Sequence, residues 1–233
     1  MGTSTSRAAR ERERTAALLS FDLEILDQVH AQAAVRPAGL DEAGRGALAG
    51  PVVVGCVRLD FSRPDLLVNA LAGLDDSKRL PPATRERLFD RIGAIAPTGV
   101  GAACAHEIDR LGIVQATSLA ARRALVSLGA PADLLLLDRG LSPHLGPSGP
   151  RETTLTHGDA LSLSIAAASV VAKVSRDRFM TRLDRRHPGY ALALHKGYGT
   201  TLHQAALARL GPSPLHRLSF RGAGERSKTA LSY

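Results

Sequence analysis

The chain has 233 residues, 44% of them hydrophobic and 3% aromatic, which is enough for one large domain with a mainly aliphatic core. The net charge is +8, and the whole surplus lies in residues 151–233, where 13 Lys/Arg accompany 5 Asp/Glu; this favours a polyanionic partner, most commonly nucleic acid, over a merely solvated basic face. No stretch approaches the roughly 18 apolar residues of a membrane span and the N-terminus lacks a signal-peptide core, so we exclude a membrane protein and expect a cytoplasmic one.

The N-terminal part of the chain begins with a charged segment. Residues 1–14 predict a poorly ordered tail, whereas residues 15–29 place apolar side chains at helical spacing and predict a short amphipathic helix. A hydrophobic stretch then meets Asp41 and a glycine-rich turn, and residues 51–59 predict a buried strand. We therefore expect two adjacent strands joined by that turn.

The rest of the chain alternates between helical and strand patterns. Helices are predicted over residues 84–96, 113–128, 161–183 and 203–211, and short strands over residues 100–105 and 134–138. This order favours an α/β domain with a mixed central sheet flanked by helices and with a C-terminal helical appendage. Cys56 and Cys104 lie in apolar runs, so we expect buried free thiols in a reducing compartment rather than a disulfide or a metal pair.

Four acidic residues stand at the edges of these elements, beside apolar or glycine neighbours: Asp41, Glu42, Asp138 and Asp159. Buried carboxylates are costly without a positive partner, and hard oxygen ligands suit Mg²⁺ or Mn²⁺. Successive strand residues point to opposite faces, so we expect Asp41 to be the central ligand. Taken singly, each acid is better explained by an ordinary turn or helix cap, and spacing alone does not show that the four converge.

Six stretches, in order along the chain, carry a specific resemblance to a known family. They are GLDEAGRGALAGPV (39–52), DDSKRL (75–80), LLLLDRG (134–140), HGDALSLSIAAASVVAKVSRDR (157–178), HKGYGT (195–200) and SPLHRLSF (213–220). Together they resemble ribonuclease HII. The resemblance implies a ribonuclease H-like catalytic domain over residues 39–220, and the chain then divides into a tail with a short helix (1–38), this domain, and a basic tail (221–233).

The resemblance also implies an activity and a partner. Enzymes of this family are metal-dependent endonucleases that use Mn²⁺ or Mg²⁺. They hydrolyse the RNA strand of RNA–DNA hybrids and cleave at ribonucleotides embedded in duplex DNA, so we expect either duplex as the partner of a monomeric protein. The active-site acids of the family fall on Asp41, Glu42, Asp138 and Asp159, its glycine–arginine–glycine element on Gly44, Arg45 and Gly46, and its substrate-reading tyrosine on Tyr198.

The chain departs from the family pattern at three positions. Ala47 stands where proline is frequent, Arg139 where glycine is usual, and Leu161 where a lysine or another polar residue is common. None of these changes removes an acid. The last two alter the surroundings of Asp138 and Asp159.

Hydrolysis of a phosphodiester needs a nucleophilic water and support for the leaving oxygen. Two ions about 3.5–4 Å apart supply both, and our hypothesis is that the four acids hold them, with Asp41 bridging. By resemblance, the products carry 5′-phosphate and 3′-hydroxyl ends. Backbone groups of residues 44–46 fit contact with a ribose 2′-hydroxyl, because glycine lets a ligand approach closely; a tight hairpin turn explains these glycines equally well.

Several other residues are candidate substrate contacts. Ser169, Lys173 and Arg176 follow i, i+4, i+7 spacing and share a helical face, although a solvated basic face is the alternative. The candidate phosphate contacts are Ser77, Lys78, Lys173, Arg176 and Lys196.

The HKGYGT loop contributes a candidate sugar contact. The ring of Tyr198 either packs against a substrate sugar or holds its own loop, and we favour the sugar contact because His195 and Lys196 share the loop. We interpret His203 and His216 as structural.

Three other functions fit parts of the sequence. A non-catalytic nucleic-acid-binding module needs only the basic last third. Another nuclease of the same fold, such as a ribonuclease HI or a junction resolvase, is disfavoured by the HKGY and DSK elements, and a phosphatase would use the same acids on small substrates. Incubation with a duplex DNA that carries one ribonucleotide, with and without chelator, separates all of them.

Overall fold

A mixed sheet with β1 at its centre organises the chain. The computed structural model describes residues 2–29 and 35–224, and its five strands lie in the order β3-β2-β1-β4-β5. Neighbours on the β3 side of β1 run antiparallel, and neighbours on the β5 side run parallel, which confirms the predicted mixed sheet. The strands are β1 (Pro37–Ala43), β2 (Val52–Val57), β3 (Thr98–Ala103), β4 (Leu134–Asp138) and β5 (Arg151–Leu155).

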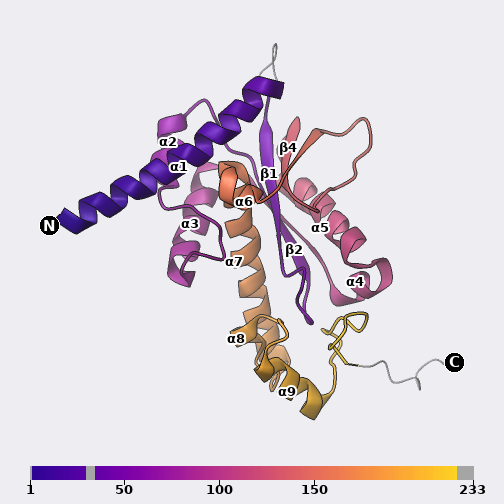
Figure 1. Cartoon of the computed structure of the whole chain (residues 1–233). Coiled ribbons are helices and arrows are strands. Elements are labelled where there is room, and N and C mark those ends of the chain that lie inside the picture. Colours follow the sequence, from indigo (N-terminus) through magenta and orange to yellow (C-terminus); the bar gives the residue numbers. More distant parts are fainter. Residues whose placement is uncertain (1, 30–34, 225–233) are drawn as a thin grey trace.

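Helices cover both faces of the sheet (Figure 1). α7 (Leu163–Arg186) packs on β1 and β2, and α5 (Ile113–Leu128) packs on β2 and β3 from the opposite face. Among the described residues, no helix is both long enough and apolar enough to cross a membrane. The remaining helices are α1 (Gly2–Val29), α2 (Pro64–Ala70), α3 (Pro82–Ile95), α4 (Ala105–Leu111), α6 (Gly158–Leu161), α8 (Leu192–His195) and α9 (Thr201–Leu210).

Glycines in the sheet let both covering helices approach closely. A Cβ atom on Gly55 would lie 2.4 Å from the carbonyl oxygen of Ala168 in α7, and one on Gly101 would lie 2.1 Å from that of Ala120 in α5. On the helix side of the first contact, residues 166–168 are alanines and are fully buried. The small-residue middle of α7 therefore has a packing role, because larger side chains would hold the helix away from the sheet.

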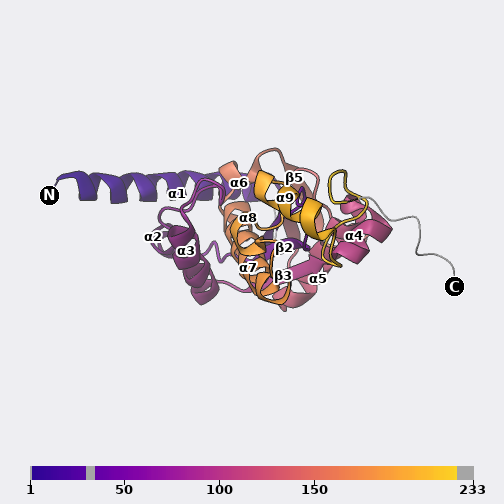
Figure 2. The same cartoon turned by 90° about the horizontal axis from the view of Figure 1, so that it is seen from below.

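The N-terminal helix is longer than the sequence analysis predicts. α1 begins at Gly2, so the expectation of a poorly ordered tail over residues 1–14 is wrong for the part that the structure describes. Residues 7–14 are all Arg, Ala or Glu, which are good helix formers, and the buried Leu18 and Leu19 anchor the following turns, from which the helix propagates. Figure 2 shows the first half of α1 projecting beyond the body of the protein.

Buried Asp22 fastens α1 to the start of α7. Its carboxylate accepts hydrogen bonds from the Ser164 N–H group at 2.9 Å and from the Ser164 hydroxyl at 2.8 Å. Burial raises the pKa of Asp22 to about 6. A residue 142 positions earlier in the chain thus holds the N-terminal end of α7. This end follows α6, which contains Asp159.

Several elements differ from the predictions, and the short helices α2, α4 and α8 are not among those predicted. The helix expected over residues 161–183 is two helices, because Ser162 caps α7 and its hydroxyl accepts a hydrogen bond from the Ile165 N–H group at 3.2 Å. Strand β5 was not predicted, since its sequence RETTL has no apolar alternation and the strand lies at the edge of the sheet.

The cysteines differ from each other in environment. Cys56 is buried in β2, as expected, but the expectation for Cys104 is wrong, because this residue is exposed. β3 ends one residue earlier, at Ala103, and Cys104 is the N-cap residue of α4. Neither thiol forms a disulfide in the described part of the chain.

The predicted C-terminal helical appendage is present at one end of the sheet (Figure 1). The end of α7, with α8 and α9, buries Met180, Tyr190 and Leu192 in a small apolar cluster. Ala223 is also fully buried in this cluster, so packed chain continues past residue 220. The rest of the expected basic tail, residues 225–233, lies outside the described residues.

The glycine contacts predict a clear stability difference. Gly55→Ala should lower the free energy of unfolding by about 1–3 kcal/mol, because the new methyl group overlaps the backbone of α7. Gly93→Ala is the matched control: it lies in α3 with no heavy atom within 4 Å of the new Cβ, and should raise the free energy by about 0.5–1 kcal/mol through helix propensity. Urea unfolding measures both, and equal effects of the two changes would contradict the packing argument.

Candidate active site

The carboxyl ends of β1 and β4 meet at one edge of the sheet. The two strands are parallel and their register pairs Leu40 with Leu137, so the residues that follow, Asp41 and Asp138, emerge side by side. Glu42 is the next residue of β1, which ends at Ala43 immediately before the glycine turn. Pairing of two distant segments thus brings three of the predicted acids together.

Asp159 reaches the same region through α6. The Gly158 N–H group donates a hydrogen bond of 2.8 Å to Asp138 Oδ1, which places the next residue, Asp159, beside the end of β4. Asp159 is 6% exposed, and its Oδ2 accepts a hydrogen bond of 3.2 Å from Lys78 Nζ. The DSK segment is thereby joined to the fourth acid.

A cavity of about 630 Å³ collects most of the predicted site residues. Asp159 is outside its lining but is bound by Lys78, which is part of it. Lys196 is also outside, and its ammonium group donates to Thr181 Oγ1 at 3.0 Å and to the Ala193 carbonyl at 2.7 Å. The cavity is lined by Asp41, Glu42, Ala43, Gly44, Arg45, Gly46, Ser77, Lys78, Arg85, Asp138, Ser169, Lys173 and Tyr198.

Burial raises the pKa of two acids of the cavity, and repulsion between carboxylates adds to this effect. Asp41 is 5% exposed, and burial, followed by repulsion from Glu42 and Asp138, holds its pKa well above the usual range. Burial also raises the pKa of Glu42, against the opposing effect of Arg45. Glu42 Oε2 is buried and has no hydrogen-bond partner among the described residues. The cavity therefore holds more negative charge than the protein's own groups satisfy.

The basic side chains around the cavity compensate this charge only in part. Arg45 Nη1 lies 3.5 Å from Glu42 Oε1 and also donates to the Gly140 carbonyl at 3.1 Å. The Lys78 side chain is 73% exposed, so water screens its pair with Asp159. Lys173 is engaged by Asp177 of its own helix at 2.8 Å rather than by the acids of the cavity.

This donor set fits a hard divalent cation. Carboxylate oxygens are the ligands that Mg²⁺ and Mn²⁺ prefer, and Glu42 Oε2 has no hydrogen-bond partner in the described part of the chain, so it is free to bind a cation. Within residues 2–29 and 35–224, no three His, Cys, Asp or Glu side chains are arranged as a metal cluster, so binding requires the acids to turn toward one another. The residues that would hold the ions are Asp41, Glu42, Asp138 and Asp159.

The expectation that Arg176 contacts phosphate is wrong. Its side chain is fully buried and donates hydrogen bonds to the carbonyl groups of Pro51 at 2.9 Å and Ala49 at 3.2 Å. Helical spacing correctly groups it with Ser169 and Lys173 on α7. The turn between β1 and β2 lies against α7 at Arg176. Helical spacing shows which residues share a face but not which other segment covers that face.

Arg85 lines the cavity, and the sequence analysis missed it. Its guanidinium group donates to the carbonyl groups of Ser77 at 2.9 Å and Leu80 at 2.5 Å, so it braces the DSK segment from α3. Ser77 is itself buried and accepts a hydrogen bond of 2.6 Å from the Ser169 hydroxyl. Nothing in the sequence distinguishes Arg85 from the other arginines of α3, because its role depends on where the helix docks.

Tyr198 lies beside the cavity on a loop that buried histidines support. Its ring is 39% exposed, and the Arg176 guanidinium carbon lies 5.5 Å from the ring centroid. His203 Nδ1 lies 3.0 Å from the Tyr198 carbonyl oxygen, and His203 Nε2 lies 3.0 Å from His216 Nε2. Burial, followed by the charge of His203, lowers the pKa of His216 to about 4. The histidines are neutral supports, in agreement with the structural role expected for them.

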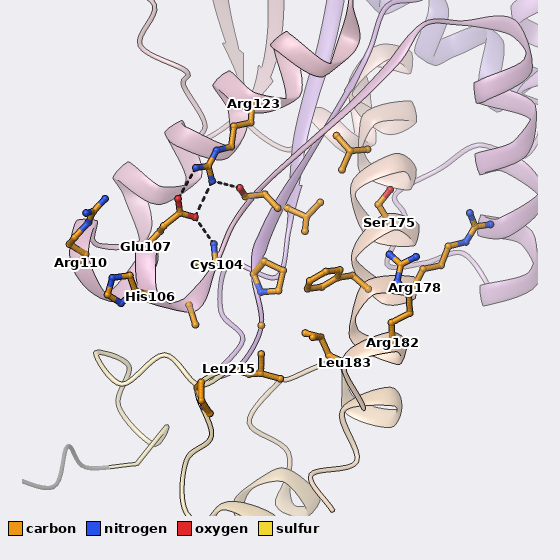
Figure 3. A pocket seen from close by; sticks show the side chains of 18 of the residues that line it. Cys104, His106, Glu107, Arg110, Arg123, Ser175, Arg178, Arg182, Leu183 and Leu215 are labelled. Atoms are coloured by element: carbon orange, nitrogen blue, oxygen red, sulfur yellow. Dashed lines mark hydrogen bonds and ion pairs between the residues drawn. The ribbon is translucent and has the colours of Figure 1, made fainter. Parts of the chain in front are cut away.

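A larger cavity of about 990 Å³ lies between α4 and α7 and contains none of the four acids (Figure 3). Phe89, Phe179 and Leu215 give it a mainly apolar lining, and on one wall Glu107 and Arg123 form an ion pair of 2.7 Å. Size alone would favour this cavity as the functional site. The smaller one is the better candidate because the perturbed carboxylates lie there.

Comparison with known proteins decides the family. The family model described as Ribonuclease HII matches residues 38–223. The chain belongs to the ribonuclease HII family. Relatives named Ribonuclease HII from Syntrophotalea carbinolica and Geobacter sulfurreducens are 54% and 51% identical to it, over 82% and 81% of this chain and 87% and 83% of theirs. α1 lies outside the matched region.

Solved structures share the fold. Ribonuclease H2 from Pyrococcus horikoshii OT3 is 24% identical, with a TM-score of 0.64 over 81% of this chain and 95% of that chain. Bst-RNase HIII in complex with Mn²⁺ is 23% identical, with a TM-score of 0.67 over 83% of this chain and 70% of that chain. These likenesses confirm the predicted ribonuclease H-like fold.

Membership of the ribonuclease HII family establishes the class of reaction. The chain is a nuclease of a family that cleaves the RNA strand of RNA–DNA hybrids and depends on divalent metal ions. The resemblance carried by the six sequence stretches is thereby confirmed. Family membership argues against the two alternatives from the sequence analysis, a phosphatase and a non-catalytic binding module.

The pKa of Asp41 predicts an unusual effect of removing a charge. Because its pKa is raised on folding, the folded wild-type protein loses stability as the pH rises from the carboxyl's unfolded value of about 3.9 through the raised folded value. Asp41→Asn escapes this loss and keeps an oxygen for the Glu42 N–H group. In chelator at pH 7.5 the variant should therefore be more stable than wild type.

Thermal unfolding in chelator at pH 4 and pH 7.5 measures this difference, which should shrink at pH 4. The exposed acid Asp27 provides the control, and Asp27→Asn should leave the midpoint unchanged at both pH values. An Asp41→Asn protein that is less stable than wild type in chelator at pH 7.5 would show that the cavity is not electrostatically strained.

Proposed function

We propose that this chain is an endonuclease that cleaves the RNA strand of hybrids and also cuts at single ribonucleotides embedded in duplex DNA. The observation that carries the proposal is the side-by-side emergence of Asp41 and Asp138, with the unpartnered Glu42 Oε2, in a cavity shared with the glycine turn and Tyr198. Membership of the ribonuclease HII family supports the substrate class.

The proposed cofactor is a pair of Mg²⁺ or Mn²⁺ ions held by Asp41, Glu42, Asp138 and Asp159. When bound, such ions would supply activation of a water and stabilisation of the leaving 3′ oxygen, and the expected products would carry 5′-phosphate and 3′-hydroxyl ends. The protein's own contribution is to hold the buried Asp41 next to Glu42 and to bring Asp138 and Asp159 beside them. Their mutual repulsion makes cation binding favourable.

The glycine turn supplies recognition of ribose. Gly44 has a φ of 86°, so its own backbone requires glycine. Gly46 has no such requirement, and a Cβ atom there would meet no protein atom within 4 Å. The missing side chain at Gly46 therefore leaves room for a bound ligand. In this proposal the ligand group is the substrate ribose, whose 2′-hydroxyl distinguishes RNA from DNA.

The remaining lining residues orient the nucleic acid. In this proposal Ser77, Lys78 and Lys173, which line the cavity, contact phosphates, and the partly exposed Tyr198 packs against the neighbouring sugar. Lys196 belongs to an adjoining hollow that it shares with Lys173, and in this proposal it contacts the strand further from the cleaved bond.

The protein acts as a monomer in the cytoplasm, where its free thiols stay reduced.

Removal of either central acid tests the proposed chemistry. Asp41→Asn and Asp138→Asn should each cleave a duplex DNA with one ribonucleotide at about one-hundredth of the wild-type rate or less, because each removes a charge from the reacting region. Asp27→Asn should cleave at the wild-type rate, and chelator should stop cleavage by every variant. Wild-type rates for Asp41→Asn or Asp138→Asn with Mg²⁺ would contradict the proposal, as would binding of the duplex without any cleavage.

Gly46→Ala separates recognition of ribose from folding. The change should leave the free energy of unfolding within about 0.5 kcal/mol of wild type, because nothing surrounds the new methyl group. Cleavage at a single ribonucleotide should fall at least about tenfold, since a substrate displaced by about 1 Å loses productive geometry. Gly93→Ala should cleave normally. Normal cleavage by Gly46→Ala would mean that the turn is only a hairpin.

A further inference from the structure

Two arginines beneath the glycine turn are buried without a carboxylate partner. Arg176 of α7 and Arg217 of the segment after α9 are each 0% exposed and rank among the largest fully buried side chains. Across the described ranges, no Asp or Glu oxygen lies within 4.0 Å of either guanidinium group. Burial of an unneutralised charge is expensive, so an arrangement that keeps two of them together calls for an explanation.

The partners of both arginines are backbone carbonyl groups of the turn between β1 and β2. Arg217 donates to Gly44 at 2.7 Å, to Arg45 at 2.8 Å and to Gly50 at 3.0 Å. Arg176 donates to the carbonyl groups of Ala49 and Pro51, as described above. Five carbonyl dipoles from one eight-residue segment therefore face inward, toward the two positive charges.

This pattern determines where the amide hydrogens of the turn point. In a trans peptide the C=O and N–H groups of one plane point in opposite directions. Because the carbonyls of Gly44 and Arg45 point toward Arg217, the N–H groups of Arg45 and Gly46 point away from it. Neither N–H group donates to any described residue, and both residues line the cavity that holds the acids.

Arg176 also links the turn to Tyr198. A Cβ atom on Gly44 would lie 1.8 Å from Arg176 Nε, so the arginine occupies the space that the glycine leaves. On its other side the same guanidinium group lies over the Tyr198 ring. The glycine turn and the tyrosine, which come from opposite ends of the catalytic domain, thus rest on one buried side chain.

The pair is electrostatically costly. Burial, followed by repulsion from Arg176, lowers the pKa of Arg217 to about 9. Arg176 Nη1 is buried and has no hydrogen-bond partner among the described residues. A turn that served only to connect two strands has no need of two such charges, because a two-residue hairpin closes with its own backbone hydrogen bonds.

We propose that Arg176 and Arg217 are positioning residues, which fix the turn so that the N–H groups of Arg45 and Gly46 stand as a preformed donor pair for the ribose 2′-hydroxyl. The inference rests on the proposed function of the cavity and deepens it. Arginine is required because its planar fork reaches two or three carbonyls at fixed angles, whereas lysine presents a single ammonium group. A positive charge at these positions does not hold the turn unless it also has the planar geometry of arginine.

Lysine substitutions test this requirement. Arg217→Lys and Arg176→Lys keep the charge but lose the fork, so cleavage at a single ribonucleotide should fall tenfold to roughly a hundredfold in kcat/KM. Affinity for an all-DNA duplex of the same sequence, measured by fluorescence anisotropy in chelator, should remain unchanged, since that duplex has no 2′-hydroxyl. Arg122→Lys is the matched control, because Arg122 also donates to a backbone carbonyl, that of Pro143, but neither residue lines the cavity, and it should cleave like wild type.

Amide hydrogen exchange of residues 43–51 provides a readout that does not depend on activity. The turn should exchange faster in both lysine variants than in wild type, while the sheet core stays protected, and this comparison also shows that each variant is folded. If one variant fails to fold, the other carries the test. Unchanged exchange with normal cleavage would overturn the inference, and so would a loss of all-DNA affinity in parallel with cleavage. A wild-type protein that does not cut at ribonucleotides would instead refute the proposed function, whatever the exchange data show.

Discussion

The parallel pairing of β1 with β4 is the constraint on which the rest of the structure depends. It brings Asp41 and Asp138, almost one hundred residues apart, to the same edge of the sheet in matching register. The antiparallel pairing of β1 with β2 then requires a turn directly after the acids, and this turn contains the glycines. Sheet topology therefore puts the carboxylates of Asp41 and Asp138 next to a turn that contains glycines.

Close packing of α7 on the sheet decides what surrounds the acids. Sheet glycines and buried alanines let the helix lie against β1 and β2, so that Ser169 and Lys173 face the cavity while Arg176, further along, lies under the turn. Residues further along α7 form a wall of the larger apolar cavity (Figure 3), and none of the four acids is part of its lining. One helix thus contributes two residues to the lining of the cavity and an arginine that binds carbonyl groups of the turn.

Charge is distributed in two layers around the turn. Carboxylates that repel one another face the cavity, and guanidinium groups that repel one another lie behind the turn. Each layer is costly by itself. The carbonyl groups of the turn satisfy the arginines, and in our proposal the amide groups on the other side of the same peptides bind a hydroxyl group next to the cations. The cost in folding stability is consistent with a site shaped for ligands rather than for stability.

The sequence by itself determined the family and the mixed α/β architecture, because strong periodicity and motif residues report on local structure and chemistry. It also singled out the four acids, of which parallel strand pairing brings Asp41 and Asp138 to one edge of the sheet. It failed for β5 and for the first half of α1, whose patterns lack an apolar face, and it did not distinguish Arg176, Arg85 and Lys196 by role. Only the tertiary structure decided that the first is buried, that the second lines the cavity and that the third does not. The physical reason is that the role of a basic side chain depends on which distant backbone or carboxylate groups it reaches, and helical spacing carries no information about them.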